Sequence, residues 1–172
     1  RRSGTMLADI LAAGIASAGG DCYMVGVIPT PAIAYLTRTH HMDAGVMISA
    51  SHNPFEYNGI KFFDGFGYKL PDETEDKIEE CMLKDERAAL QSRPTGAAIG
   101  TISAWTDLQQ EYADFICKST DIDLSGLKVV HDGANGSASV LGPEILKRLG
   151  AEVIAIHHEP NGVNINEKCG ST

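Results

Sequence analysis

The sequence lacks a long hydrophobic run. None of its apolar stretches approaches the roughly 20 residues that a helix needs to cross a bilayer. It also lacks a G-x-G-x-x-G run after a predicted strand, which argues against an unrelated Rossmann-like dinucleotide-binding domain. We therefore expect a protein that does not enter the membrane and does not bind a dinucleotide.

Clustered positive charge is missing as well. The chain has 14 Lys and Arg against 23 Asp and Glu, for a formal net charge of -9. Its adjacent basic pairs, Arg1-Arg2 and Lys147-Arg148, lie at opposite ends of the sequence. A surface of this kind repels nucleic acid and anionic membranes, so neither is expected as a partner.

Cysteines are few, and no two of them form a C-x-x-C pair. The four cysteines (Cys22, Cys81, Cys117 and Cys169) are widely spaced. This spacing fits neither a zinc site nor a disulfide framework. Reduced thiols in a cytoplasmic protein are the expectation that follows.

The composition that remains is typical of a globular domain. Of the 172 residues, 43% are apolar and 22% charged, which is enough to bury a sizeable core. The chain starts in a helix-like sequence without Met and stops in the turn-like Cys169–Thr172. We therefore expect a fragment of a longer protein.

The first half alternates helices with short apolar strands. We predict a helix capped by Ser3 and ended by Gly19-Gly20, and a second helix with Pro31 in its first turn. The expected strands are 22–27 and 44–50, and both are almost entirely apolar. This order predicts an α/β fold with a mixed, largely parallel sheet sandwiched by helices.

The pattern continues and then restarts. We predict a hairpin from 60–64 and 68–70, an acidic helix over 71–84, a linker over 91–96, a strand over 99–105, and a helix capped by Thr106 that ends near 118. A second unit would follow, with strands over 127–131 and 152–157 around a helix over 138–149. The predicted domains are 1–118 and 119–172, truncated at the N- and C-terminal side respectively.

The segment 49–59 has no periodicity and follows a buried strand. It places the Ser51 hydroxyl beside His52 and Asn53, and Pro54 restricts the conformation of Asn53. Ligands of open α/β sheets bind at the carboxyl ends of strands, and converging donors of this kind suit a phosphate. The same residues also make ordinary turns, so the residue types alone leave both interpretations open.

Ten residues beyond the serine, Lys61 stands among apolar neighbours after Gly59. A lysine in this position either extends into solvent or is held at a site. Gly59 would allow a close approach of backbone or a bulge.

The stretch GVMISASHNPFEYNGIKFFDGFGYKL (45–70) resembles the phosphoserine segment of the α-D-phosphohexomutase superfamily. The segments at 1–4, 26–31 and 132–136 are similar to that superfamily too. The last stretch, 160–171, resembles its glucosamine-specific branch. The resemblance covers essentially the whole chain, and S-H-N-P followed by N-G-x-K is its most specific part.

The resemblance implies a four-domain enzyme, of which this chain would hold most of the first domain and the start of the second. Ser51 would be the phosphorylated serine, and Ser49 lies two residues too early in the motif. Lys61 and His52 would be catalytic, Lys61 as general acid/base, and Asn53 would belong to the phosphate loop. The Ser51 phosphate would contact Mg²⁺, whose aspartate ligands lie in a loop that this chain lacks, so the fragment alone should be inactive.

The implied reaction interconverts glucosamine 6-phosphate and glucosamine 1-phosphate, with glucosamine 1,6-bisphosphate as intermediate and activator. Its product would feed UDP-N-acetylglucosamine and bacterial peptidoglycan precursors in the cytoplasm. The partner would be a small-molecule sugar phosphate, and a homodimer is one of the oligomeric states left open. The alternatives are a phosphomannomutase or phosphoglucomutase of the same superfamily, or a non-catalytic homologue that binds sugar phosphates.

Three further features receive other interpretations. The histidine pairs 40–41 and 157–158 have no acidic or cysteine residue at ligand spacing in the sequence, which predicts surface or helix-end histidines. The loop Asp132–Gly136 is interpreted as a structural turn, with an anion cradle as the alternative. Arg1 is assigned no role.

Overall fold

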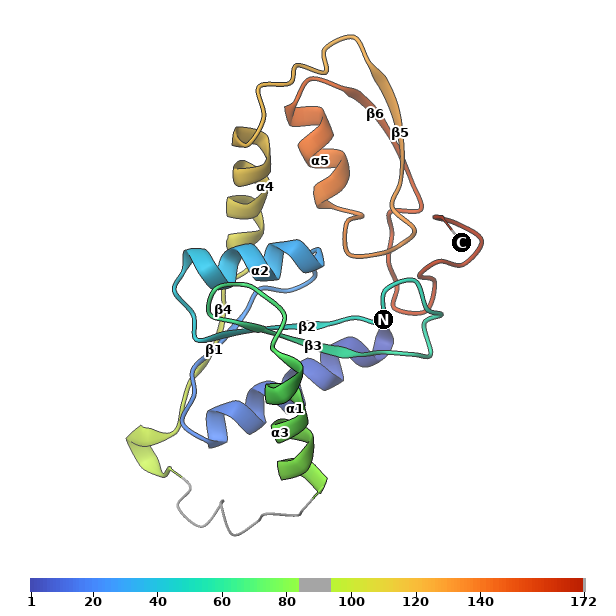
Figure 1. Cartoon of the computed structure of the whole chain (residues 1–172). Coiled ribbons are helices and arrows are strands. Elements are labelled where there is room, and N and C mark those ends of the chain that lie inside the picture. Colours follow the sequence, from blue (N-terminus) through green and yellow to red (C-terminus); the bar gives the residue numbers. More distant parts are fainter. Residues whose placement is uncertain (84–93, 172) are drawn as a thin grey trace.

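The computed structural model describes residues 1–83 and 94–171 (Figure 1). Its helices are α1 (Arg2–Ser17), α2 (Thr30–Thr39), α3 (Asp72–Leu83), α4 (Leu108–Lys118) and α5 (Leu141–Arg148), with a 3-10 turn η2 (Gly96–Ala98). Its strands are β1 (Cys22–Met24), β2 (Ala44–Ile48), β3 (Ile60–Asp64), β4 (Ile102–Ala104), β5 (Lys128–Asp132) and β6 (Glu152–Ile156). The predicted linker 91–96 lies partly outside the described residues.

The strands pair two by two. β1 pairs with β4 and β5 with β6, both in parallel, whereas β2 and β3 are antiparallel. The α/β class with mixed, largely parallel strands is therefore confirmed. The partner of β2 differs from the expected one, because the chain returns directly through 49–59 to β3 instead of placing β2 beside β1.

Two predicted helix caps are wrong. α1 already begins at Arg2, so Ser3 lies inside its first turn, and its Oγ accepts a hydrogen bond from Asn58 Nδ2 at 3.0 Å. α4 begins at Leu108 without a side-chain cap, because the chain takes a helix-like turn before it. Thr106 contributes to that turn only its carbonyl, which accepts from Gln109 N at 3.1 Å.

The buried core lies where three helices meet (Figure 1). Residues from α2 and the turn before it pack with residues of α4 and α5: Ile28, Ala32, Leu36, Tyr112, Ala113 and Leu141. Leu141 comes from the predicted second unit, so this core joins both sides of the expected boundary at 118. The boundary itself stays a prediction.

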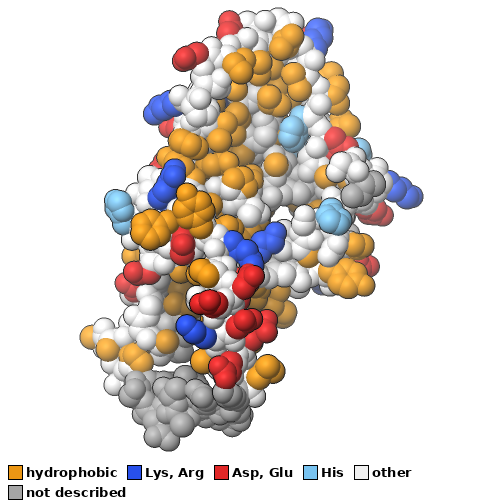
Figure 2. Space-filling model, viewed as in Figure 1, with side chains coloured by type: hydrophobic (Ala, Val, Ile, Leu, Met, Phe, Trp, Pro, Cys, Tyr) orange, Lys and Arg blue, Asp and Glu red, His pale blue; other side chains and the backbone are white. Residues whose placement is uncertain are grey.

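Other apolar side chains are exposed. Figure 2 shows hydrophobic side chains over the upper part of the molecule and acidic ones gathered where α3 lies. One face of the β5–β6 pair exposes Val130 and Ile154, which oppose each other in the register. α3 buries none of its residues, and its first turn carries the three acidic side chains expected there. Within the described ranges, no helix has the length and apolar character needed to span a membrane.

Candidate functional site

The strand pair β2–β3 carries the predicted site. Ser49 N donates to Gly59 O at 2.8 Å, which extends the ladder by one bond beyond the strands. A Cβ on Gly59 would lie 3.1 Å from the Ser49 carbonyl oxygen, so the close approach predicted for Gly59 is present. The residues between Ser49 and Gly59 form a loop at the carboxyl end of β2.

Ser51 is exposed and its backbone is left-handed. Its φ is 54°, a region that costs a non-glycine residue about 1–2 kcal/mol. Ser51 N donates to Ser49 Oγ at 3.2 Å, and Asn53 N donates to Ala50 O at 3.1 Å. Ser49 is the alternative phosphorylation site in the sequence. Its hydroxyl oxygen accepts a hydrogen bond that stabilises the turn at Ser51.

A side chain that sequence reasoning left without a role holds this turn from the outside. Arg1 Nη2 donates to Ser51 O at 2.7 Å and to Asn53 O at 2.9 Å. Burial lowers the pKa of the Arg1 guanidinium from its ordinary value. The two partners are 50 residues apart in the sequence, so no local sequence pattern could have indicated this role.

The second missed residue comes from the far end of the chain. Asn166 Nδ2 donates to His52 O at 3.0 Å, although 114 residues separate the two. The backbone beside it is tied to α1, because Arg2 N donates to Gly162 O at 2.7 Å. The C-terminal segment therefore rests against the predicted phosphoserine loop.

Among the described hydrogen bonds and ion pairs, none joins Ser51 to the other predicted site residues, His52, Asn53 and Lys61. The side chains of His52 and Asn53 are exposed in the same turn. Lys61 lies on β3 opposite Met47, and its side chain is exposed. Their proposed roles stay predictions. Lys61 lies on the hydrogen-bonded strand pair that carries the loop, and this pairing sets where its backbone stands relative to Ser51.

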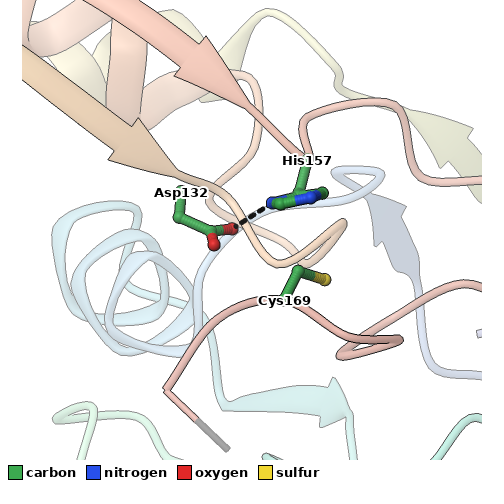
Figure 3. Close-up of side chains that lie close together, drawn as sticks. All are labelled: Asp132, His157 and Cys169. Atoms are coloured by element: carbon green, nitrogen blue, oxygen red, sulfur yellow. Dashed lines mark ion pairs between the residues drawn. The ribbon is translucent and has the colours of Figure 1, made fainter.

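The histidines lie where the sequence predicted them, at a helix end or at the surface, but two of them have acidic partners from other elements. His157 Nδ1 lies 3.1 Å from Asp132 Oδ1, and these two side chains form a group with Cys169 (Figure 3). Their candidate ligand atoms all lie within 4.8 Å of one another. His40 also has an acidic partner, since its Nε2 lies 2.9 Å from a Glu111 carboxylate oxygen. The sequence hid these partners because they come from other elements.

The group in Figure 3 has the donor types of a zinc ligand set. Its polar atoms already make hydrogen bonds within the protein. Asp132 accepts hydrogen bonds from Gly170 N and Ala134 N at 2.9 and 2.8 Å, which with His157 lower the pKa of its carboxyl. Burial, with help from the Asp132 charge, raises the pKa of the Cys169 thiol. The arrangement joins the ends of β5 and β6 to the C-terminal segment.

The loop Asp132–Gly136 is a turn, as predicted. Gly133 N and Asn135 N donate to the carbonyls of Ile156 and His157, and Gly136 N donates to Gly133 O. Ala134 N donates to Asp132 Oδ1, so all four N–H groups from Gly133 to Gly136 already have acceptors in the loop or at the end of β6, and the loop offers no cradle of free donors for an anion. The structural interpretation is the one that fits.

The described residues around Ser51 form no group of three His, Cys, Asp or Glu side chains that could hold a metal ion. In the part of the chain that the structure describes, the group in Figure 3 is the one set of three His, Cys, Asp or Glu side chains spaced for a metal ion, and it contains no residue of the Ser51 loop. A phosphate on Ser51 would contribute oxygen, the donor that Mg²⁺ prefers. Its carboxylate ligands stay a prediction from the resemblance, which places them in a loop outside this chain.

Comparison with known proteins defines the class of this fold and loop. Residues 1–89 match the family described as phosphoglucomutase/phosphomannomutase, alpha/beta/alpha domain I. A solved phosphoglucomutase/phosphomannomutase family protein from Burkholderia thailandensis superposes with a TM-score of 0.77 at 27% identity, over 94% of this chain and 35% of that one. The chain belongs to the phosphoglucomutase/phosphomannomutase family.

Within that family, the curated relatives are more specific. Phosphoglucosamine mutases from Desulforamulus reducens and Symbiobacterium thermophilum are each 55% identical to this chain over 172 residues. The match covers 100% of this chain and 38% of each relative. The chain therefore spans well under half the length of the relatives that it matches.

Proposed function

We propose that the full-length protein containing this chain is a phosphoglucosamine mutase that interconverts glucosamine 6-phosphate and glucosamine 1-phosphate through a phosphoserine at position 51. The observation that carries the proposal is the 52–55% identity to phosphoglucosamine mutases over the whole chain. The exposed Ser51 hydroxyl, on a turn held by bonds from both ends of the chain, supports the same assignment.

The proposed reaction has two phosphoryl transfers. In the first, the O1 oxygen of glucosamine 6-phosphate bonds to the phosphorus on Ser51 as the Oγ–P bond breaks. The proton of that sugar hydroxyl passes to a base, the departing Ser51 Oγ takes up a proton, and Lys61 and His52 are the side chains proposed for these proton transfers. Glucosamine 1,6-bisphosphate then turns in the site and returns its 6-phosphoryl group to Ser51 Oγ, which leaves glucosamine 1-phosphate.

The chain's own contribution is to fix the donor oxygen. Phosphoryl transfer depends mainly on positioning and charge stabilisation, and a phosphoserine carries about -1.5 to -2 charge at neutral pH. Mg²⁺, held by the Ser51 phosphate and by carboxylates outside this chain, would neutralise part of that charge. The setting that we propose is the bacterial cytoplasm, where the product would supply UDP-N-acetylglucosamine for peptidoglycan.

The test is to map phosphate on the full-length protein before and after brief exposure to glucosamine 6-phosphate with Mg²⁺. We expect phosphate on Ser51, its loss on exposure to this sugar, and slow loss with glucose or mannose phosphates. Ser51→Ala should abolish the label, whereas Ser49→Ala should keep it. Equal discharge by the hexose phosphates would favour the phosphomannomutase/phosphoglucomutase alternative, and an active, unlabelled Ser51→Ala variant would exclude the proposal.

A further inference from the structure

Three consecutive carbonyl groups in the Ser51 loop are held by side chains from outside it. Arg1 takes the first and third, those of Ser51 and Asn53, at 2.7 and 2.9 Å. Asn166 takes the middle one, that of His52, at 3.0 Å. All three bonds are made by donors at least 50 residues away in the sequence.

These bonds determine the orientation of the backbone around the phosphorylation site. In a trans peptide the C=O and the following N–H point in opposite directions, so holding a carbonyl also directs the next N–H. The carbonyl of Ser51 is thereby turned toward Arg1, and the N–H of His52 is turned away from it. The Asn53 N–H, turned away from the Asn166 side chain, donates to Ala50 O at 3.1 Å and closes the turn.

The conformation that they hold is an unfavourable one. Ser51 has a φ of 54°. A residue other than glycine keeps a left-handed backbone only where several surrounding contacts hold it there. The internal support is weak, since Ser51 N donates to Ser49 Oγ at 3.2 Å and is exposed. The outside donors therefore supply much of the constraint, and they fix the direction in which the Ser51 side chain leaves the backbone.

We infer that Arg1 and Asn166 are positioning residues for phosphoryl transfer, a conclusion that rests on the proposed role of Ser51. Arg1 bridges two carbonyls with one nitrogen, and its guanidinium brings a positive charge to the backbone of the loop that would carry the phosphate. Asn166 makes the geometry of the loop depend on the C-terminal segment. Neither residue is required to touch the sugar, so each should act on the transfer step and not on substrate binding.

The experiment measures steady-state kinetics and single-turnover transfer from phosphorylated Ser51 to glucosamine 6-phosphate in the full-length protein. For Asn166→Ala we expect kcat and the single-turnover rate to fall about 10- to 100-fold, with KM within about two-fold, because a misplacement near 1 Å costs about that much. Asn166→Asp keeps the size of the side chain, puts a carboxylate oxygen against the His52 carbonyl, and should be at least as slow.

Arg1→Ala should behave like Asn166→Ala, and Arg1→Lys should recover part of the rate, since it keeps the charge but loses the planar guanidinium geometry. Asn161→Ala and Arg38→Lys are matched controls. Asn161 caps its own segment through Val163 N at 3.0 Å without reaching the loop, and Arg38 is exposed at the end of α2. Both controls should transfer at the wild-type rate.

The outcomes separate the two proposals. If wild-type Ser51 transfers phosphate and Asn166→Asp transfers as fast as the controls, the positioning role is refuted while the proposed function stands. A rise in KM with unchanged kcat also refutes positioning, because it would show loss of binding. If wild-type Ser51 never carries phosphate, the proposed function fails and this inference fails with it. Thermal unfolding of each variant shows whether a slow variant is folded.

Discussion

The tip of the hairpin that follows β3 packs against the backbone of α2, and this contact offers a sharp test of the fold around the site. Gly67 has a φ of 83°, and a Cβ there would collide with the Ala34 carbonyl oxygen and lie 3.1 Å from its carbonyl carbon. Gly67→Ala therefore adds two penalties. One is the left-handed backbone and the other is a clash with backbone atoms that cannot rotate away.

The matched control is Gly126→Ala. Gly126 has a φ of 85°, nearly the same, and a Cβ there would meet nothing within 4 Å. The left-handed penalty of about 1–2 kcal/mol is partly offset by a less flexible unfolded chain, which leaves a net loss of about 1 kcal/mol at Gly126. Overpacking adds about 1–3 kcal/mol, so we expect about 2–4 kcal/mol at Gly67.

The assay is native-state hydrogen exchange in the full-length protein, because it reports local opening. The amides to follow are Gly67 N, bonded to Asp64 O at 2.9 Å, and Leu70 N, bonded to Phe62 O at 3.2 Å. A loss of about 2–4 kcal/mol lowers their protection roughly 30- to 800-fold, against about five-fold near Gly126. Equal losses at the two glycines would show that the tip does not pack on α2 as described.

Two other predictions concern the C-terminal segment. The pKa of Asp132 is lowered in the folded protein, first by its bonds from backbone N–H groups, so its contribution to stability is complete above the ordinary carboxyl pKa near 3.9 and is lost as pH falls through the lower folded value. The protection of Gly170 N against exchange, relative to the unfolded chain at the same pH, should fall over that acid range in the wild type, and Asp132→Asn should show no such fall. Cys169 is 6% exposed and burial raises its thiol pKa, whereas Cys81 is exposed, so iodoacetamide at pH 8 should alkylate Cys81 at least about ten times faster. Equal rates would place Cys169 at the surface.

Local sequence patterns predicted most elements because their causes are local. The apolar runs and the glycine and proline positions indicated α2, α3, α5 and the parallel pair β5–β6, and the S-H-N-P segment indicated the exposed turn at Ser51. The predicted strands 22–27, 44–50 and 99–105 were too long, since an apolar residue continues a pattern even where the ladder stops, whereas 60–64 matched β3. Two caps were wrong for a related reason: a serine or threonine near a helix start has the right chemistry, but the backbone decides where the helix begins.

The remaining features depend on contacts between distant segments. No window around Arg1 contains Ser51, and no window around Asn166 contains His52, so their roles are absent from any local pattern. The pairing of β2 with β3 was missed because a half-buried antiparallel strand can be as uniformly apolar as a parallel one. His157 appeared isolated for the same reason, since its partners belong to β5 and to the C-terminal segment.

The contact between Asn166 and His52 also sets an order of events during synthesis. A ribosome makes Ser51 long before Asn166, and 114 residues separate the donor of this bond from its acceptor. While that intervening chain is being made, β2 and β3 can pair, but the middle carbonyl of the turn has no donor. The nascent protein can therefore complete the turn at Ser51 only after the chain up to Asn166 has left the ribosome and docked.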